Sequence, residues 1–349
     1  MAKFTIISPA EVGVTASGGR FDLELEALTP IGAEIIEVNA PTDEELVKHA
    51  QNADALYVRR RKVTKTIIDG LANCKVISLA SVGVDTVEVD AATARNIPVT
   101  NMPDTFIEEV ADHAMMLILA THRRLVEQDR MARDGRWREA RPILYKNPRL
   151  MGQTLGLIAF GHVARAVAKR AKPFGFHIIA YDPYVEELVM TERDVEPVAT
   201  LDELLHRSDI VSLHAPSTED AFHLMKEEQF RAMKPEALFI NTGRGATVDE
   251  SALIKALDEG WIAAAGLDVL EQEPPGGNNP LLSMDKVILT SHVASASARF
   301  EPTRKLRVGR EMALVLSGRW PMSCVNPSVL PKTDLRRWQP FSMERGPGS

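Results

Sequence analysis

The sequence is poor in the residues that mark several common classes of protein. Only two cysteines, Cys74 and Cys324, occur in 349 residues, and they form no CxxC pair. Their scarcity argues against a disulfide framework and a thiolate metal site, and it predicts a reducing, cytoplasmic environment. No pair of histidines has the HExxH spacing of a metal site either, so we expect no bound metal.

Long apolar runs and an excess of positive charge are missing as well. The longest apolar stretch, residues 114–120, is about a third of a membrane span, and the N-terminus lacks the apolar core of a signal peptide. The 41 Lys and Arg residues are outnumbered by 48 Asp and Glu, which gives a net charge of −7. We therefore expect no membrane span and no nucleic acid as a direct partner.

What the sequence does contain is enough apolar material for two soluble globular domains, since 45% of its residues are hydrophobic and 26% are charged. Short apolar strands alternate with helical patterns, which predicts the α/β class with parallel sheets. A mostly apolar helix over 106–124 and an aperiodic excursion over 123–149 separate two such regions. The predicted strands are 4–7, 34–38, 55–58, 75–79 and 97–101 in the first region, and 155–159, 176–181, 209–213, 237–241, 263–268 and 286–290 in the second.

An imperfect dinucleotide-binding motif follows the first strand of the second region. In residues 159–164, AFGHVA, an alanine stands where GxGxxG has its first glycine. Gly161 lets the main chain approach a pyrophosphate, whereas the methyl group of Ala159 should strain a tight turn. Asp182 ends the next strand, roughly 20 residues further on, where an acid accepts hydrogen bonds from the adenosine ribose and repels a 2′-phosphate. No arginine follows Asp182, which favours NAD over NADP; the alternative is that Asp182 merely caps its strand.

Three further side chains follow predicted strands of the second region: Arg244, Glu273 and His292. The carboxyl ends of parallel strands form the ligand-binding edge of such a sheet. Hydride transfer between a 2-hydroxy acid and a nicotinamide needs a proton donor at the C2 oxygen, a cation for the substrate carboxylate and a group that favours the protonated donor. His292, Arg244 and Glu273 suit these tasks in that order. The glycines on either side of Arg244 predict that the backbone there lies close to another group. Taken alone, however, each acid or histidine could be a solvated or structural residue.

Several tracts together resemble the D-isomer-specific 2-hydroxyacid dehydrogenases, and most of all the branch that includes the C-terminal-binding-protein corepressors. They are residues 81–85 (SVGVD), 110–113 (VADH), 152–156 (GQTLG), 181–183 (YDP) and 241–245 (NTGRG), with the surroundings of Glu273 and His292, while the run 166–176 carries the similarity to the branch. The resemblance implies two doubly wound parallel-sheet domains. Residues 1–102 and 297–327 would form a discontinuous, flavodoxin-like substrate domain, 103–296 a Rossmann NAD-binding domain, and 328–349 a flexible C-terminal tail.

The resemblance also implies an activity and roles for particular residues. Arg244, Glu273 and His292 match the catalytic residues of the family, and the implied enzyme is a cytoplasmic homodimer that interconverts a 2-keto acid and its D-2-hydroxy acid with NAD. The alternative is an NAD(H)-sensing, corepressor-like binding protein with vestigial dehydrogenase activity, against which the retention of all three catalytic residues argues. Cofactor contacts would come from Gly161, His162, Val163, Asp182, Pro216, Thr242 and Asp268, and substrate contacts from Arg59, Val82, Gly83 and Arg244. Ala159 and His162 depart from the family pattern and predict a lowered affinity for NAD.

Overall fold

The computed structural model describes residues 3–10 and 21–337. The chain divides into two compact units, the first formed by residues 1–105 and 298–349 and the second by residues 106–297. Each unit contains a parallel sheet with helices on both faces, so the predicted α/β class with two doubly wound domains is confirmed. No helix in the described part of the chain is long and apolar enough to cross a membrane.

The first unit contains a five-stranded sheet in the order β2-β1-β3-β4-β5, which is the flavodoxin-like order. Its strands are β1 (Phe4–Pro9), β2 (Ala33–Val38), β3 (Ala55–Val58), β4 (Val76–Leu79) and β5 (Val99–Thr100). Three helices share a core with one face of this sheet: α2 (Asp43–Ala50), α3 (Lys65–Gly70) and α4 (Val89–Ala94). Two more helices, α1 (Asp22–Leu28) and α13 (Phe300–Leu316), pack against each other, and α13 also contacts β4.

The residues after α13 continue the folded part of the first unit. A 3₁₀ helix spans Pro327–Lys332, and its Val329 and Leu330 are buried. The side chain of Asn326 accepts a hydrogen bond from the Val99 amide at 2.8 Å, which ties this segment to β5. The predicted flexible tail therefore starts too early, because burial of two apolar side chains holds residues 328–332 in place. Residues 338–349 of that tail lie outside the described residues.

The second unit contains a seven-stranded parallel sheet in the order β12-β11-β10-β9-β6-β7-β8. Its strands are β6 (Thr154–Ile158), β7 (His177–Tyr181), β8 (Glu196–Pro197), β9 (Ile210–Leu213), β10 (Leu238–Asn241), β11 (Ala264–Leu267) and β12 (Val287–Leu289). The order is that of the Rossmann fold with one added strand. The chain reverses direction across the sheet between β6 and β9, and ligands bind at the carboxyl ends of the strands near that point.

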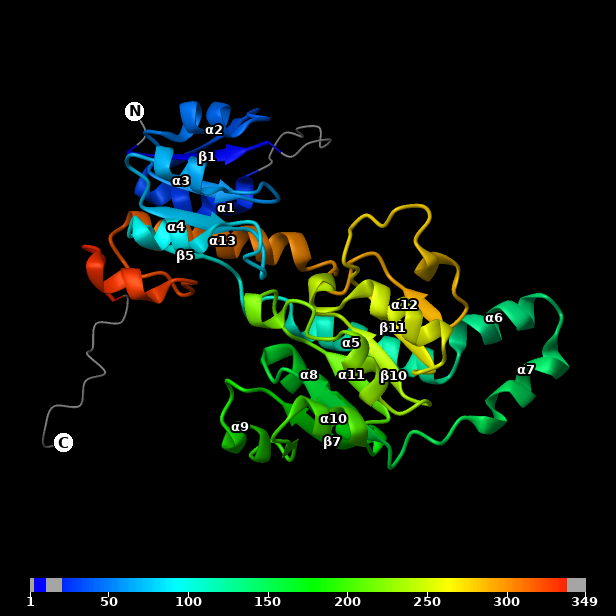
Figure 1. The fold of residues 1–349 in the computed structure, drawn as a ribbon. Coiled ribbons are helices and arrows are strands. Elements are labelled where there is room, and N and C mark those ends of the chain that lie inside the picture. The colour runs from blue at the N-terminus through cyan, green and yellow to red at the C-terminus, as the bar shows by residue number, and fades with distance from the viewer. Residues whose placement is uncertain (1–2, 11–20, 338–349) are drawn as a thin grey trace, which may run out of the picture. The chain divides into compact units, whose positions relative to one another are not determined.

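Helices cover both faces of this second sheet (Figure 1). On one face lie α5 (Ile107–His122), α8 (His162–Ala171) and α9 (Glu187–Thr191), and on the other lie α10 (Leu201–Arg207), α11 (Glu227–Ala232) and α12 (Glu250–Asp258). Because both faces are covered, strands such as β9 and β10 are buried along their whole length. This explains why three of the four residues in each strand are apolar, which made the strands predictable.

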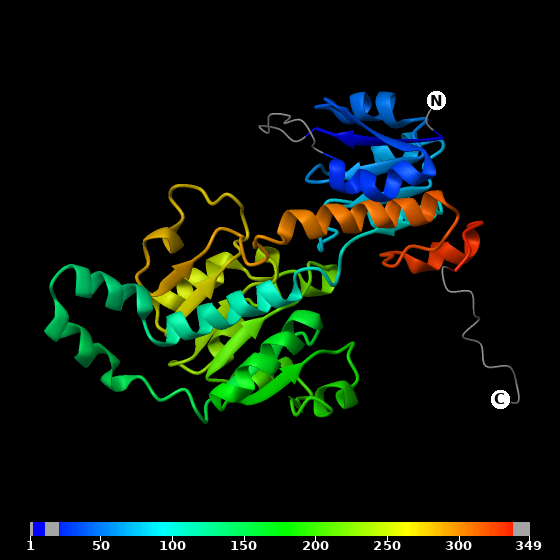
Figure 2. The ribbon, with the colours of Figure 1, turned by 180° about the vertical axis from the view of Figure 1, so that it is seen from behind.

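Residues 123–149 form an excursion that we call the arm. It contains two α-helices, α6 (Leu125–Arg133) and α7 (Trp137–Ile143). Figures 1 and 2 show the arm as a loop that stands off from the rest of the second unit. Only Met131 and Ala140 are buried within these two helices. They were not predicted, because the excursion is rich in charged residues and each of its two helices buries a single side chain.

Candidate active site

The loop between β6 and α8 presents a free helix N-terminus. Gly161 is the residue that caps α8, and a Cβ placed on it would meet no atom within 4 Å. The amides of His162, Val163 and Ala164 find no acceptor among residues 3–10 and 21–337. Unpaired amides at the positive end of a ten-residue helix suit a pyrophosphate, so the cradle fits a dinucleotide.

Ala159 occupies the tight turn in front of this cradle. Its φ is 66°, in the left-handed region that favours glycine, and its amide donates to the Tyr181 carbonyl at 2.9 Å. The predicted strain at Ala159 is therefore confirmed, since an L-residue with a Cβ is disfavoured there.

Asp182 lies directly after β7, beside the same loop. One carboxylate oxygen, Oδ2, accepts from the Phe160 amide at 2.8 Å, and Oδ1 accepts from the Tyr184 amide at 2.8 Å. The carboxylate is thus fixed next to the glycine loop rather than free in solvent. The Tyr184 hydroxyl donates to Asp220 at 2.8 Å, and that bond raises the pKa of Tyr184. A second carboxylate therefore lies at this edge of the sheet, and its negative charge would repel a 2′-phosphate.

Two other predicted cofactor contacts, Pro216 and Thr242, follow β9 and β10. Pro216 is exposed, whereas Thr242 is buried with its hydroxyl 3.5 Å from Nδ1 of His214. The other ring nitrogen of His214 lies 2.9 Å from the Ser212 hydroxyl, and burial lowers the pKa of His214 to about 4. His214 is therefore neutral at physiological pH and contributes no charge to this edge.

Arg244 follows β10 in a turn that is held by its neighbours. The Asn241 side chain donates to the Arg244 carbonyl at 3.1 Å, and the Thr247 hydroxyl donates to the same oxygen at 2.6 Å. A Cβ on Gly243 would lie 3.0 Å from the Ala215 carbonyl oxygen, and a Cβ on Gly245 only 1.8 Å from that of Leu270. The predicted close approach is thus confirmed for both flanking glycines, and each approaches another stretch of backbone.

Glu273 and His292 come from the loops after β11 and β12, and they form a hydrogen-bonded pair. The distance from His292 Nδ1 to Glu273 Oε2 is 2.7 Å, and Glu273 Oε1 accepts from the Leu270 amide at 3.0 Å. The His292 and Glu273 side chains are 48% and 36% exposed, so the pair is open to a ligand. His292 has a φ of 55°, a strained backbone of the kind that collects at functional sites.

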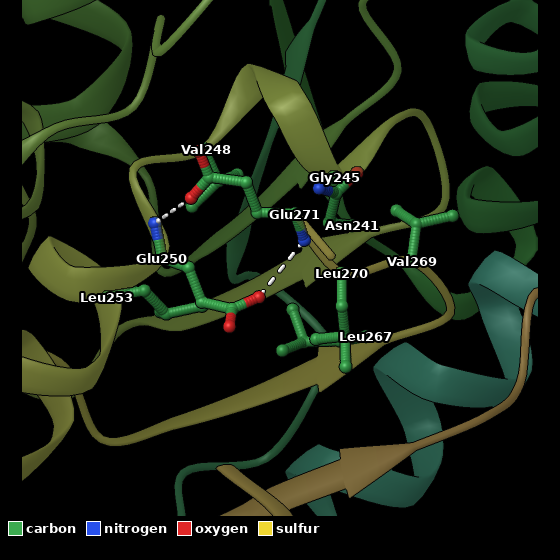
Figure 3. Close-up of a pocket in the computed structure, with 9 residues that line it drawn as sticks. All are labelled: Asn241, Gly245, Val248, Glu250, Leu253, Leu267, Val269, Leu270 and Glu271. Carbon is green, nitrogen blue, oxygen red and sulfur yellow. Dashed lines mark hydrogen bonds between the residues drawn. The ribbon is translucent and has the colours of Figure 1, made fainter. Parts of the chain in front are cut away.

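The loop that carries Glu273 is fastened to α12 by a pair of glutamates (Figure 3). The Glu250 amide donates to Glu271 at 3.2 Å, and the Glu271 amide donates to Glu250 at 3.0 Å. His223 also contacts Glu271, with its Nε2 2.7 Å from Oε1. The cavity beside Glu250 and Glu271 measures about 10 Å³, which is at most the space of one water molecule, so it is not a substrate site.

Asp268 is buried after β11 and grips the loop that carries His292. Its Oδ1 accepts from the Thr290 hydroxyl at 2.6 Å and the Val293 amide at 3.0 Å, and its Oδ2 accepts from the Ala294 amide at 2.9 Å. The His292 amide donates to the Asp268 carbonyl at 2.8 Å. This positioning of the loop was not predicted, and the expected contact of Asp268 with the cofactor stays a prediction.

The predicted substrate contacts other than Arg244 belong to the first unit. The loop after β4 exposes the amides of Val82 and Gly83, which have no acceptor within the described ranges. Arg59, by contrast, is buried and donates to Glu37 at 2.5 Å and to the Pro9 carbonyl at 3.0 Å. A substrate carboxylate would have to compete with Glu37, so these contacts give the predicted role of Arg59 no support.

Together, the second unit gathers the predicted catalytic residues on the loops of three adjacent strands: Arg244 after β10, Glu273 after β11 and His292 after β12. The cradle at α8 and Asp182 lie at the carboxyl ends of β6 and β7 in the same sheet. The arrangement can bind a dinucleotide and move a proton beside it. Sequence reasoning missed Glu271 and Thr290 as supports of these loops, and no local pattern marks them.

Comparison with known proteins identifies the relatives of this chain. The family model described as D-isomer specific 2-hydroxyacid dehydrogenase, NAD binding domain, matches residues 115–294. A glyoxylate reductase from Thermofilum pendens is 41% identical over 305 residues, which cover 85% of this chain and 88% of that protein. A D-3-phosphoglycerate dehydrogenase from Methanocaldococcus jannaschii is 39% identical over 86% of this chain, but the match covers only 57% of that protein.

Solved structures agree with the sequence relatives. An NADPH-dependent glyoxylate/hydroxypyruvate reductase from Sinorhizobium meliloti, in complex with NADP and malonate, is 30% identical, with a TM-score of 0.79 over 96% of this chain and 99% of that chain. These relatives are enzymes, so the alternative of a corepressor-like binding protein receives no support, and the comparisons do not specify the branch to which the sequence pointed.

Proposed function

This chain belongs to the D-isomer specific 2-hydroxyacid dehydrogenase family, and from that membership we propose that it reduces a small 2-keto acid to the D-2-hydroxy acid with NADH, and catalyses the reverse reaction. The observation that carries the proposal is the His292–Glu273 pair, 2.7 Å apart at the ligand-binding edge of a Rossmann sheet. When bound, the nicotinamide supplies or accepts the hydride. The residues of this chain bind both reactants and handle the proton.

His292 acts as the acid and base. The Glu273 carboxylate can only accept a hydrogen bond, so the Nδ1 of His292 carries a hydrogen that points toward it. That leaves Nε2 to deliver a proton to the substrate oxygen during reduction and to remove it during oxidation. Arg244 binds the substrate carboxylate through its planar guanidinium and orients the keto group.

The coenzyme is held by the α8 cradle and the neighbouring loops. The amides of His162 and Val163 beside Gly161 bind the pyrophosphate, and Asp182 binds the adenosine ribose. Contacts closer to the nicotinamide come from Pro216, Thr242 and Asp268. Fixed acids at the ribose end, with no arginine after Asp182, favour NAD over NADP.

The first unit serves as the substrate domain and the second as the NAD-binding domain, with bounds near 1–102 and 297–327 for the former and 103–296 for the latter. The match of the NAD-binding family model to residues 115–294 supports this division. In the substrate domain, the unpaired amides of Val82 and Gly83 are suited to the substrate carboxylate. The free state of both cysteines favours a cytoplasmic location.

The active species is a homodimer whose second copy covers the arm. Leu125, Trp137 and Tyr145, all within residues 123–149, are each more than half exposed, and large apolar side chains on one segment support a surface that a second copy covers. A cavity of about 430 Å³ lies where the arm joins the sheet, and its buried Thr121 hydroxyl and Gln153 amide oxygen have no partner within residues 3–10 and 21–337. Analytical ultracentrifugation should show that the wild-type protein is a dimer. Leu125→Glu should weaken the dimer, whereas Leu188→Glu, a change at an exposed residue of α9, should not. A monomeric wild type would contradict this assembly.

The activity is tested by following NADH oxidation with glyoxylate, hydroxypyruvate, pyruvate and longer keto acids. The proposal predicts turnover with at least one of them, and a larger kcat/KM with NADH than with NADPH. Tight NADH binding without turnover on any keto acid would instead favour a nucleotide-sensing protein. The glyoxylate reductase among the relatives makes glyoxylate the first substrate to try.

A further inference from the structure

His113 lies on α5, far in sequence from the catalytic residues, yet it contacts the loop that carries His292. Its Nε2 is 2.8 Å from the Thr290 hydroxyl and 3.5 Å from Asp268 Oδ1. The imidazole is only 15% exposed, and the Asp268 side chain is 1% exposed. This contact joins two parts of the second unit that are separated by more than half of its residues.

The chemistry of the three groups fixes the direction of the hydrogen bonds. Both oxygens of Asp268 accept, since their other partners are the amides of Val293 and Ala294. The single proton of the Thr290 hydroxyl therefore goes to Asp268, at 2.6 Å, and its oxygen accepts from His113. His113 must then carry a hydrogen on Nε2, and the bonds run in one direction from His113 through Thr290 to Asp268.

This series of bonds ends on the loop that holds His292 in a strained backbone. Asp268 binds Thr290 on one side of His292 and Val293 on the other, and its carbonyl accepts from the His292 amide. A left-handed backbone at a residue other than glycine persists only where its surroundings hold it. The bonds to Asp268 supply that constraint, and His113 fixes their outer end.

We propose that His113 is a positioning residue for catalysis: by donating to Thr290, it holds Asp268 and the His292 loop in the geometry that keeps His292 paired with Glu273. The inference rests on the proposed function, because it concerns the alignment of the residue that transfers the proton. His113 itself need not touch either reactant.

Three substitutions separate this role from simple packing. In His113→Gln, the side-chain amide reaches about as far as Nε2 of histidine and can still donate to Thr290. In His113→Asn, the side chain is too short to make this contact. In His113→Leu, the side chain fills the space but has no donor. We expect kcat to fall on the order of tenfold in the Asn and Leu variants, as misplaced catalytic groups do, and to recover in the Gln variant. The Kd for NADH should change by a smaller factor than kcat, because the α8 cradle and Asp182 do not depend on His113.

Full activity of the Asn and Leu variants would overturn the proposal, and so would equal losses in all three variants. Amide hydrogen exchange of residues 292–294 in the coenzyme-free protein gives a readout that does not require turnover. We expect faster exchange in the Asn and Leu variants and wild-type exchange in the Gln variant; unchanged exchange in all three would refute the positioning role. If the wild type turns over no keto acid while exchange follows this pattern, the proposed function fails and the positioning role stands.

Discussion

Replacing Gly245 with alanine should lower kcat, because the new methyl group would clash with the backbone of a neighbouring loop. A Cβ at this position would lie 1.8 Å from the Leu270 carbonyl oxygen and 2.6 Å from the Glu271 amide nitrogen. Neither atom is at the end of a flexible side chain, so one of the two loops must move. To bring the closest pair of atoms to 3.0 Å, the backbones must separate by about 1.2 Å.

That displacement reaches the catalytic pair directly. The Leu270 amide donates to Glu273 Oε1, and the other oxygen of Glu273 holds His292. Misplacing a catalytic group by roughly 1 Å can cost on the order of 100-fold in rate. We therefore expect Gly245→Ala to lower kcat by roughly that factor, while NADH binding at the α8 cradle, which lies on another loop, changes little.

The assay compares steady-state kcat and the Kd for NADH, measured by quenching of NADH fluorescence, in two variants. Gly277→Ala is the matched control, because a Cβ there meets nothing within 4 Å and the residue lies beyond Glu273 in the same connection between β11 and β12. The control should retain wild-type kcat. Wild-type kcat in Gly245→Ala, with circular dichroism showing a folded protein, would refute the link between this close contact and catalysis.

Three further changes have defined outcomes. Ala159→Gly should raise the free energy of unfolding by about 0.5–1 kcal/mol, measured by urea denaturation, because it relieves a left-handed backbone; a loss of stability would contradict this. Asp182→Ala should weaken NADH binding and narrow the preference for NADH over NADPH, and an unchanged ratio of their Kd values would contradict its role. Burial lowers the pKa of His214 from 6.5 to about 4, so between these pH values the unfolded chain binds a proton that the native protein does not bind. The free energy of unfolding, measured by urea denaturation, should therefore fall by at most about 3 kcal/mol between pH 6.5 and 4. In His214→Gln it should fall less steeply with pH.

The alternation of strands and helices was predictable because most of these elements bury apolar side chains. β9 and β10 are short, mostly apolar segments, and the connectivity of parallel strands then limits the possible order of the sheet. The arm could not be predicted in the same way. Its helices bury only Met131 and Ala140, and charged residues, which form ion pairs such as Arg136–Glu139, dominate the segment.

The same distinction applies to the site. Asp182 was identified because it follows a predicted strand at the spacing that the fold requires, whereas Glu273 and His292 were selected by their order after Arg244 and by the resemblance to the dehydrogenase family. The contact of His113 with Thr290 and the pairing of Arg59 with Glu37 join residues distant in sequence, and no local pattern encodes either. Sequence therefore indicated where the chemistry takes place, whereas the contacts that hold the reactive groups required coordinates.

The central claim is that His292 transfers the proton while other residues bind the coenzyme. The most direct test compares kcat for keto-acid reduction and the Kd for NADH in the wild type, in His292→Gln and in His206→Gln, a matched change at an exposed histidine on α10. The account predicts a fall in kcat of about 10²–10⁴-fold for His292→Gln alone, with the Kd for NADH close to that of the wild type in both variants. Undiminished turnover in His292→Gln would contradict the account.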